Sequence, residues 1–64
     1  MYTSIYYSAA GTSRNCGTFE YLISFARRLL SGDSGSIEIR DAHGTLKASL
    51  WTENGEVKEW STQP

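Results

Sequence analysis

The second half of the chain, residues 37–60, limits the possible fold more than any other feature. Three short segments there alternate apolar and polar residues and are separated by two glycine-containing turns: Ser36 to Arg40, Thr45 to Trp51 and Glu56 to Ser61. Asn54-Gly55, between the last two segments, is among the strongest local signals for a β-hairpin. The pattern therefore predicts an antiparallel meander that contains both tryptophans of the chain.

The N-terminal residues predict one further strand. Thr3 to Tyr7 is rich in β-branched and aromatic residues and alternates in polarity, as strands do. We expect Ile5 and Tyr7 to face the core and Tyr2 and Tyr6 to lie on the opposite face. Residues 8–17 are small, polar and contain glycine, so we expect them to form a connection.

An amphipathic helix follows this connection. Six apolar residues recur at helical spacing: Phe19, Leu22, Ile23, Ala26, Leu29 and Leu30. Thr18 is a suitable N-cap, Glu20 lies in the positive first turn, and Arg27 and Arg28 lie near the negative end. Gly32 is expected to end the helix in the left-handed conformation.

The register of the first predicted hairpin decides which side chains of the meander face the helix. An odd number of loop residues would place Ile39 opposite Lys47, which conflicts with a buried face. We therefore expect an even loop after residue 40. Ile37 and Ile39 then share the core face with Leu46, Ala48 and Leu50.

The second hairpin leaves two alternatives open. An even loop places Val57 on the core face and Trp60 outside with Lys58. A three-residue loop with a bulge at Gly55 reverses this and sends Trp60 inward. Trp51 faces outward in both cases.

Together these elements predict an α+β fold of the order βαβββ: a four-stranded, mainly antiparallel sheet with one helix packed on one face. The 64 residues form a single domain, near the lower size limit for folding on a hydrophobic core alone, and residues 62–64 are expected to fray. The predicted core includes either Val57 or Trp60. Its other members are Ile5, Tyr7, Phe19, Leu22, Ile23, Ala26, Leu29, Leu30, Ile37, Ile39, Leu46, Ala48 and Leu50.

Composition narrows the function classes. The net charge of −1 argues against a generic binder of polyanions. The single cysteine, Cys16, excludes an internal disulfide. We expect no signal peptide, because residues 2–7 alternate in polarity and no basic segment precedes them, and no run approaches transmembrane length. These observations favour a cytoplasmic protein.

No pattern in the sequence indicates catalysis, a metal or a cofactor. Cys16 precedes a helix and His43 could serve as its base, but no third group is placed to orient them. One cysteine and one histidine lack the spacing of a metal site. Arg14, in the connection ahead of the helix, is a candidate for contact with an anion. We therefore expect a protein that is not an enzyme.

The sheet face that the helix leaves open is the candidate site. With even loops it collects aromatic and basic residues, which we predict as the partner-binding set: Tyr2, Tyr6, Arg40, Lys47, Trp51, Lys58 and Trp60. Aromatic residues and arginine dominate protein interfaces. Aromatics among cations are also used to bind single-stranded nucleic acid, a homodimer could bury the same face, and cross-strand aromatic pairs could simply stabilise a small sheet.

The pattern resembles a class of small helix-plus-meander proteins from phages and mobile elements, which includes some anti-CRISPR inhibitors. The resemblance is carried by the helix Thr18–Leu30, the segment Ser36-Ile-Glu-Ile-Arg-Asp-Ala-His-Gly-Thr-Leu-Lys-Ala and the final Gly-x-Val-x-x-Trp. It implies a stoichiometric inhibitor that occludes a surface of a large protein or ribonucleoprotein complex, in the host cytoplasm if the protein is phage-encoded. No binding residue can be transferred through it.

Overall fold

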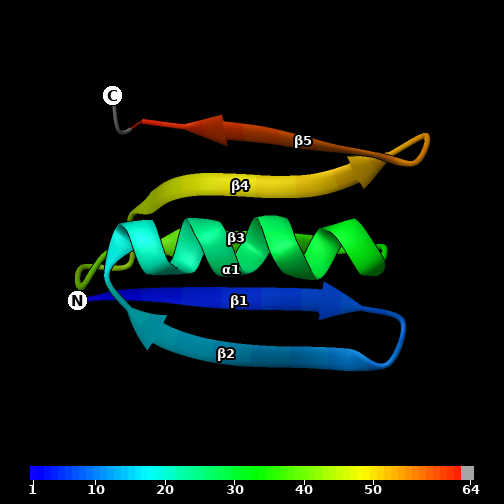
Figure 1. The fold of residues 1–64 in the computed structure, drawn as a ribbon. Helices are drawn as coiled ribbons and strands as arrows, with labels where there is room; N and C mark the ends of the chain where they lie inside the picture. Colours follow the sequence, from blue (N-terminus) through cyan, green and yellow to red (C-terminus); the bar gives the residue numbers. More distant parts are fainter. Residues whose placement is uncertain (63–64) are drawn as a thin grey trace.

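Five strands form a single antiparallel sheet, and one helix lies across one of its faces (Figure 1). The computed structural model describes residues 1–62. The elements in chain order are β1 (Tyr2–Ser8), β2 (Gly11–Gly17), α1 (Phe19–Gly32), β3 (Ser36–Arg40), β4 (Leu46–Glu53) and β5 (Glu56–Ser61). The prediction of an α+β fold is confirmed, but the expected four strands are one too few.

The additional strand is β2, which occupies most of the segment expected to be a connection. It pairs with β1 in one unbroken register, from Tyr2 opposite Gly17 to Ser8 opposite Gly11. The order of elements is therefore ββαβββ rather than βαβββ. An edge strand exposed on both faces needs no apolar alternation, which is why its polar sequence did not indicate a strand.

The strands lie side by side in the order β2-β1-β3-β4-β5, so β2 and β5 are the two edges. β1 pairs with β3 although β2 and α1 separate them in the chain. The helix runs along the strands on the near side in Figure 1. The opposite face of the sheet is not covered by any described residue of the chain.

The helix begins as predicted and ends differently. The Thr18 side chain accepts a hydrogen bond of 3.1 Å from the Tyr21 N–H, which confirms Thr18 as the N-cap. Gly32 is the last helical residue and has no positive φ, so its predicted left-handed conformation is wrong. Asp33 instead ends the helix in an extended conformation, and its N–H donates to the Leu29 carbonyl at 3.0 Å.

The core lies between α1 and the central strands, where the apolar periodicities predicted it. Eight buried side chains form it: Leu22, Ile23, Ala26, Leu30, Ile37, Ile39, Ala48 and Leu50. Phe19 and Leu29 pack against this cluster while remaining partly exposed, as do Tyr2 and Tyr6. All eight buried members belong to the predicted core.

The two faces of β1 are the reverse of those predicted. Ser4 lies opposite Ile39 and Tyr6 lies opposite Ile37, so even-numbered residues of β1 face the helix. Ile5 and Tyr7 therefore lie on the uncovered face, and their predicted packing under the helix is wrong. Both faces of this strand carry an aromatic residue, so alternation alone did not distinguish them. The small Ser4 side chain, 3% exposed, fits beneath the helix.

The expected even loop of the first hairpin is wrong, although Ile37 and Ile39 still share the core face with Ala48 and Leu50. The Asp41 N–H donates to the Thr45 carbonyl and the Gly44 N–H to the Asp41 carbonyl, both at 3.0 Å, so three residues form the loop. A β-bulge compensates for the odd number, because Ile39 pairs with Ala48 while Arg40 pairs with Leu46. Leu46 is only half-buried and lies outside the core, contrary to prediction.

The second hairpin adopts the even alternative. Glu53 pairs with Glu56, and the two residues between them have positive φ angles of 53° at Asn54 and 80° at Gly55, as a type I′ turn requires. Trp60 consequently faces outward.

The C-terminal end of the described chain lies beside β4. Thr62 donates its N–H to the Lys47 carbonyl at 3.0 Å. The other two residues of the expected frayed tail, 63 and 64, lie outside the described residues.

Candidate binding face

The sheet face opposite α1, called the outer face below, consists of residues brought together in two straight rows across the strands. The first row is Thr12, Tyr7, Ser36, Trp51 and Lys58, in the order β2-β1-β3-β4-β5. The second row is Arg14, Ile5, Glu38, Ser49 and Trp60. Arg40, two residues after Glu38 on β3, extends the face beyond the second row.

Some of the predicted partner-binding residues lie on the outer face, and others do not. Arg40, Trp51, Lys58 and Trp60 lie on the outer face as expected. Lys47 is the extra residue of the bulge in β4, with its ammonium 4.0 Å from Asp41 Oδ2. The predicted placement of Tyr2 and Tyr6 on this face is wrong, because β1 presents its other side. The outer face instead receives residues that were not predicted there, among them Ile5, Tyr7 and Arg14.

Glu38 connects the two strands β1 and β3 at the centre of the outer face. Its Oε1 accepts hydrogen bonds from the Tyr7 hydroxyl at 3.0 Å and from Arg40 Nη2 at 3.3 Å. The bond to the carboxylate raises the pKa of Tyr7, because the phenol must keep its proton to donate it. Arg40 Nη1 also donates to the Gly44 carbonyl at 2.9 Å. These bonds hold the side chains of β1 and β3 in fixed positions.

Ile5 is buried although no second layer covers it. It is 8% exposed and lies in register between Arg14 and Glu38. The aliphatic parts of long polar side chains can shield an apolar neighbour while their charged ends stay in water. Ile5 therefore forms a small apolar centre beneath the charged groups of the outer face.

The two tryptophans lie on neighbouring strands and differ in exposure. Trp51 is half-buried, and its indole N–H donates to Glu53 Oε1 at 3.2 Å. Trp60, on the edge strand β5, is 48% exposed. A large aromatic surface left in water is typical of a contact residue at a protein interface.

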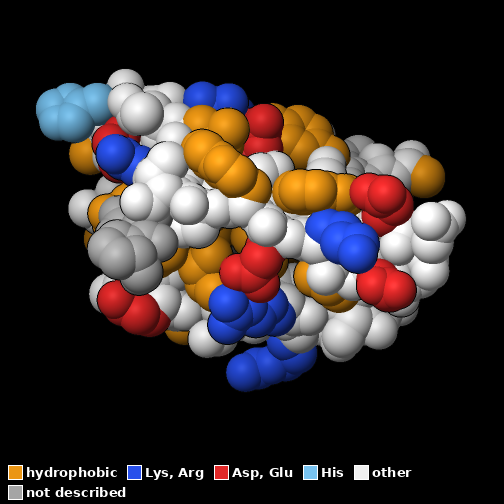
Figure 2. All heavy atoms as spheres, turned by 90° about the horizontal axis from the view of Figure 1, so that it is seen from above, with side chains coloured by type: hydrophobic (Ala, Val, Ile, Leu, Met, Phe, Trp, Pro, Cys, Tyr) orange, Lys and Arg blue, Asp and Glu red, His pale blue; other side chains and the backbone are white. Residues whose placement is uncertain are grey.

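Carboxylates accompany most of the cations that were predicted to bind a partner. Arg40 pairs with Glu38 at 3.3 Å, Lys58 with Glu56 at 3.3 Å, and Lys47 approaches Asp41. Within residues 1–62, Arg14 is the outer-face cation that forms no ion pair. Because most of its cations are paired, the outer face lacks the continuous cationic track that a nucleic acid backbone favours. Figure 2 views the molecule from the β5 edge of the sheet, where hydrophobic side chains are interspersed with both signs of charge.

Within residues 1–62, the two reactive side chains, Cys16 and His43, form no hydrogen bond with each other. Cys16 is exposed on β2, and its nearest polar partner is the Thr3 hydroxyl at 3.8 Å. His43 lies in the β3–β4 loop, where its backbone N–H donates to Asp41 Oδ1 at 2.9 Å. In the described part of the chain, no group of three or more His, Cys, Asp or Glu residues could hold a metal ion.

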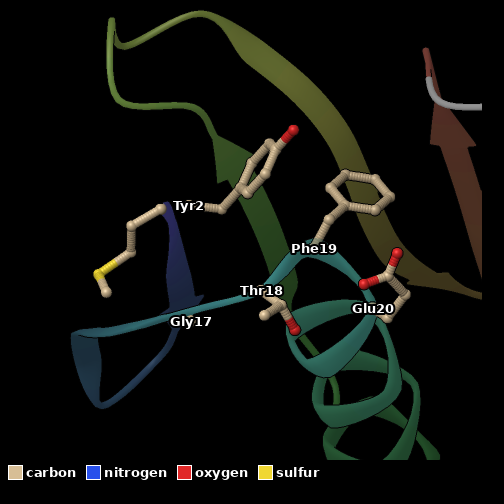
Figure 3. A pocket seen from close by; sticks show the side chains of 6 residues that line it. Tyr2, Gly17, Thr18, Phe19 and Glu20 are labelled. Atoms are coloured by element: carbon tan, nitrogen blue, oxygen red, sulfur yellow. The ribbon is translucent and has the colours of Figure 1, made fainter.

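An open hollow of about 520 Å³ lies where β1 meets the start of α1 (Figure 3). Tyr2 and Phe19 meet there edge to face, with ring centroids 5.3 Å apart. Tyr2, expected on the outer face, thus belongs to the helix side of the sheet. Gly17, Thr18, Glu20 and Met1 complete the lining.

No family model, curated protein or solved structure matches this chain. No helix within residues 1–62 is long and apolar enough to cross a membrane. The outer face therefore has to be interpreted from its own geometry and chemistry. It offers a surface of mixed charge with one well-exposed indole, that of Trp60.

Proposed function

We propose that this protein is a non-enzymatic binding protein whose outer face docks on a protein partner. The observation that carries the proposal is the exposure of Trp60, 48%, on a sheet face that no described residue covers. Exposed aromatic residues beside arginine and tyrosine supply most of the energy in many protein interfaces. Trp60, Trp51, Tyr7 and Arg40 are the expected anchors.

The pairing of the cations favours a protein over a nucleic acid as the partner. Binding to a nucleic acid draws its affinity from cations that replace counterions on the phosphates. On the outer face, Arg40 and Lys58 already have carboxylate neighbours, and Glu38 lies between the aromatic residues. A protein surface with mixed polar groups complements such a face better than a chain of phosphates.

The inhibitor role is the more specific part of the proposal. It rests on the resemblance of the helix and meander to small phage and mobile-element proteins of the anti-CRISPR type. A small domain of 64 residues with an uncovered sheet face is compatible with an inhibitor that covers a surface of its target. We therefore propose a stoichiometric inhibitor of a large protein or ribonucleoprotein complex.

Photo-crosslinking tests the docking face. The photoreactive residue p-benzoylphenylalanine replaces Lys58 on the outer face in one variant and Ser24 on the exposed side of α1 in the matched control. We expect position 58, and not position 24, to form an adduct with one discrete protein. The purified partner should lose activity when one equivalent of wild-type protein is added, and Trp60→Ala should weaken this inhibition.

Three results would contradict the proposal. Equal adducts from positions 24 and 58 would show that the outer face is not selective. An adduct that nuclease removes would favour single-stranded nucleic acid as the ligand. An adduct that joins two copies of the chain would indicate a homodimeric protein whose outer face is buried.

A further inference from the structure

The free edge of β2 is a second surface prepared for contact. β2 lies at one end of the strand order, and its far side has no neighbouring strand within residues 1–62 (Figure 1). Its residues from Gly11 to Cys16 are all exposed. An edge of this kind presents a row of backbone N–H and C=O groups whose natural partner is another extended chain.

The two edges of the sheet differ in their protection. β5 carries three charged residues within six, Glu56, Lys58 and Glu59, and Glu59 is tied to the helix. Such charges normally keep an edge from pairing with another chain. β2 has seven residues with one charge, Arg14, no proline and no bulge against β1. β2 is therefore the edge that is open to a further strand.

Two aromatic residues on α1, Tyr21 and Phe25, form an apolar shelf beside this edge. Tyr21 is 57% exposed, and its ring lies so near Gly17 that a Cβ there would approach it to 2.9 Å. Phe25 stacks on Tyr21 with ring centroids 6.4 Å apart. The helix runs antiparallel to β2 (Figure 1), so Phe25 lies about two strand residues further along, level with Asn15.

The strand beneath the aromatic shelf has no large side chains. The residues of β2 that face the helix side are Gly11, Ser13, Asn15 and Gly17. Beyond Phe25, the surface continues into an open hollow of about 310 Å³ that Leu29 and Arg28 help to line. Apolar side chains of an added strand would therefore have space to reach the shelf.

On the outer side of the same edge, the exposed side chain is a cation and not an apolar group. Arg14 is at the middle of β2, exposed and without an ion pair in the described chain. An acidic residue directly across from it would complete a favourable cross-strand pair. Because side chains alternate between the faces of a strand, the neighbours of that acid would point to the helix side.

We propose that the free edge of β2 binds an extended peptide strand in which a Glu or Asp opposite Arg14 is flanked by apolar residues that contact the aromatic shelf. The peptide pairs antiparallel to β2 and extends the sheet to six strands. This site shares only Arg14 with the outer face and does not depend on the proposed function of that face. A second copy of β2 fits less well, because pairing centred on residue 14 would oppose two arginines.

The test uses the whole protein labelled with ¹⁵N and a seven-residue peptide of alternating Val and Glu. We expect the amide signals of residues 12–16 and the ring signals of Tyr21 and Phe25 to shift on titration. Two further peptides carry N-methyl groups at the odd or at the even positions. Only one of the two should bind, because alternate N–H groups of a strand face its partner.

Charge exchange tests the predicted register. Arg14→Glu should weaken the Val–Glu peptide about two- to fivefold and strengthen a Val–Lys peptide by a similar factor. Lys58→Glu, which makes the same change on the other edge strand, should alter neither affinity. Trp60→Ala should also leave peptide binding unchanged, which separates this site from the outer face. Phe25→Leu, which keeps an apolar side chain, should weaken binding while the amide spectrum of the free protein remains that of a folded domain.

The proposal is overturned if the amides of residues 12–16 do not shift at millimolar peptide, or if both N-methylated peptides bind equally. It is also overturned if the shifts centre on Trp60, which would place the peptide on the outer face. A dimer that forms through β2, detected by sedimentation, would also overturn the proposal, because a second copy would already occupy the edge.

Discussion

Arg27 and Glu59 join the helix to the edge strand β5 through two parallel hydrogen bonds. Arg27 Nε and Nη2 donate to Glu59 Oε1 and Oε2, each at 2.9 Å. This forked geometry is the strongest arrangement available to an arginine and a carboxylate. All six residues of β5 are exposed, so little apolar burial holds this strand. The pair therefore fixes a strand that the core contacts only weakly.

This pair predicts a loss of stability in acid. The hydrogen bonds from Arg27 lower the pKa of Glu59 below its ordinary value of 4.5. A group whose pKa is lower in the folded state contributes stability above its unfolded pKa, and this contribution is lost as the pH falls through the folded pKa. Urea unfolding measured between about pH 5 and pH 3 should therefore show a smaller loss of stability for Glu59→Gln than for wild type.

Arg27→Ala is the matched control for this experiment, because it removes the same interaction from the other side. Both variants should retain a part of the acid dependence that comes from Asp41. The pKa of that carboxyl is lowered by hydrogen bonds from the backbone N–H groups of Thr45 and His43. Identical acid profiles for wild type and Glu59→Gln would contradict the prediction.

We expect the stability of the fold to depend strongly on Ile37, because this residue is fully buried in the core and lies directly across from Leu50. Ile37→Ala should lower the free energy of unfolding by about 2–5 kcal/mol. For a domain of this size the total is roughly 3–10 kcal/mol, so the substitution should remove a large share of the stability. Urea unfolding followed by circular dichroism measures the difference.

Val57→Ala is the control for the core substitution. Val57 also faces the helix side of the sheet, but it lies on the edge strand and is 36% exposed. We expect it to cost less than about 1 kcal/mol. Equal costs for Ile37→Ala and Val57→Ala would show that β5 is buried as deeply as β3.

Two glycines predict opposite effects of the same substitution. Neither Gly55 nor Gly32 has a heavy atom within 4 Å of an added Cβ, so space does not distinguish them. Gly55 has a φ of 80°, where a side chain is strained, and Gly55→Ala should destabilise the protein by about 1 kcal/mol. Gly32 is helical, and Gly32→Ala should stabilise it by about 0.5–1 kcal/mol. Thermal unfolding of both variants measures the signs, and destabilisation by Gly32→Ala would indicate a left-handed residue there.

The exposure of the two tryptophans predicts different fluorescence. Trp51→Phe leaves Trp60 as the only indole, and Trp60→Phe leaves Trp51. Acrylamide should quench the variant that keeps Trp60 more strongly, because this residue is 48% exposed on an edge strand while Trp51 is half-buried. The reverse order would mean that the Asn54-Gly55 turn contains an additional loop residue and that Trp60 faces the helix.

Much of the fold followed from local patterns, although the candidate face followed only in part. The helix and the three C-terminal strands are periodic over many residues, and Thr18 and Asn54-Gly55 carry chemistry that their conformations require. For β1, each alternate set of residues contains aromatic side chains, so hydrophobicity did not favour one face. That single ambiguity misplaced Tyr2 and Tyr6 and concealed Tyr7 as a residue of the outer face.

The sequence by itself determined the α+β class, the helix with its N-cap, the central core residues and the outward direction of Trp51. Only the tertiary structure decided that β2 is a strand, that β1 turns Tyr7 outward and that a bulge at Lys47 compensates for an odd loop. The physical reason is that an edge strand and a bulge depend on pairing with residues distant in the chain. Apolar periodicity in the sequence indicates which residues are buried against the helix. β2 and the outer face are not buried against it, so this signal is absent from their residues.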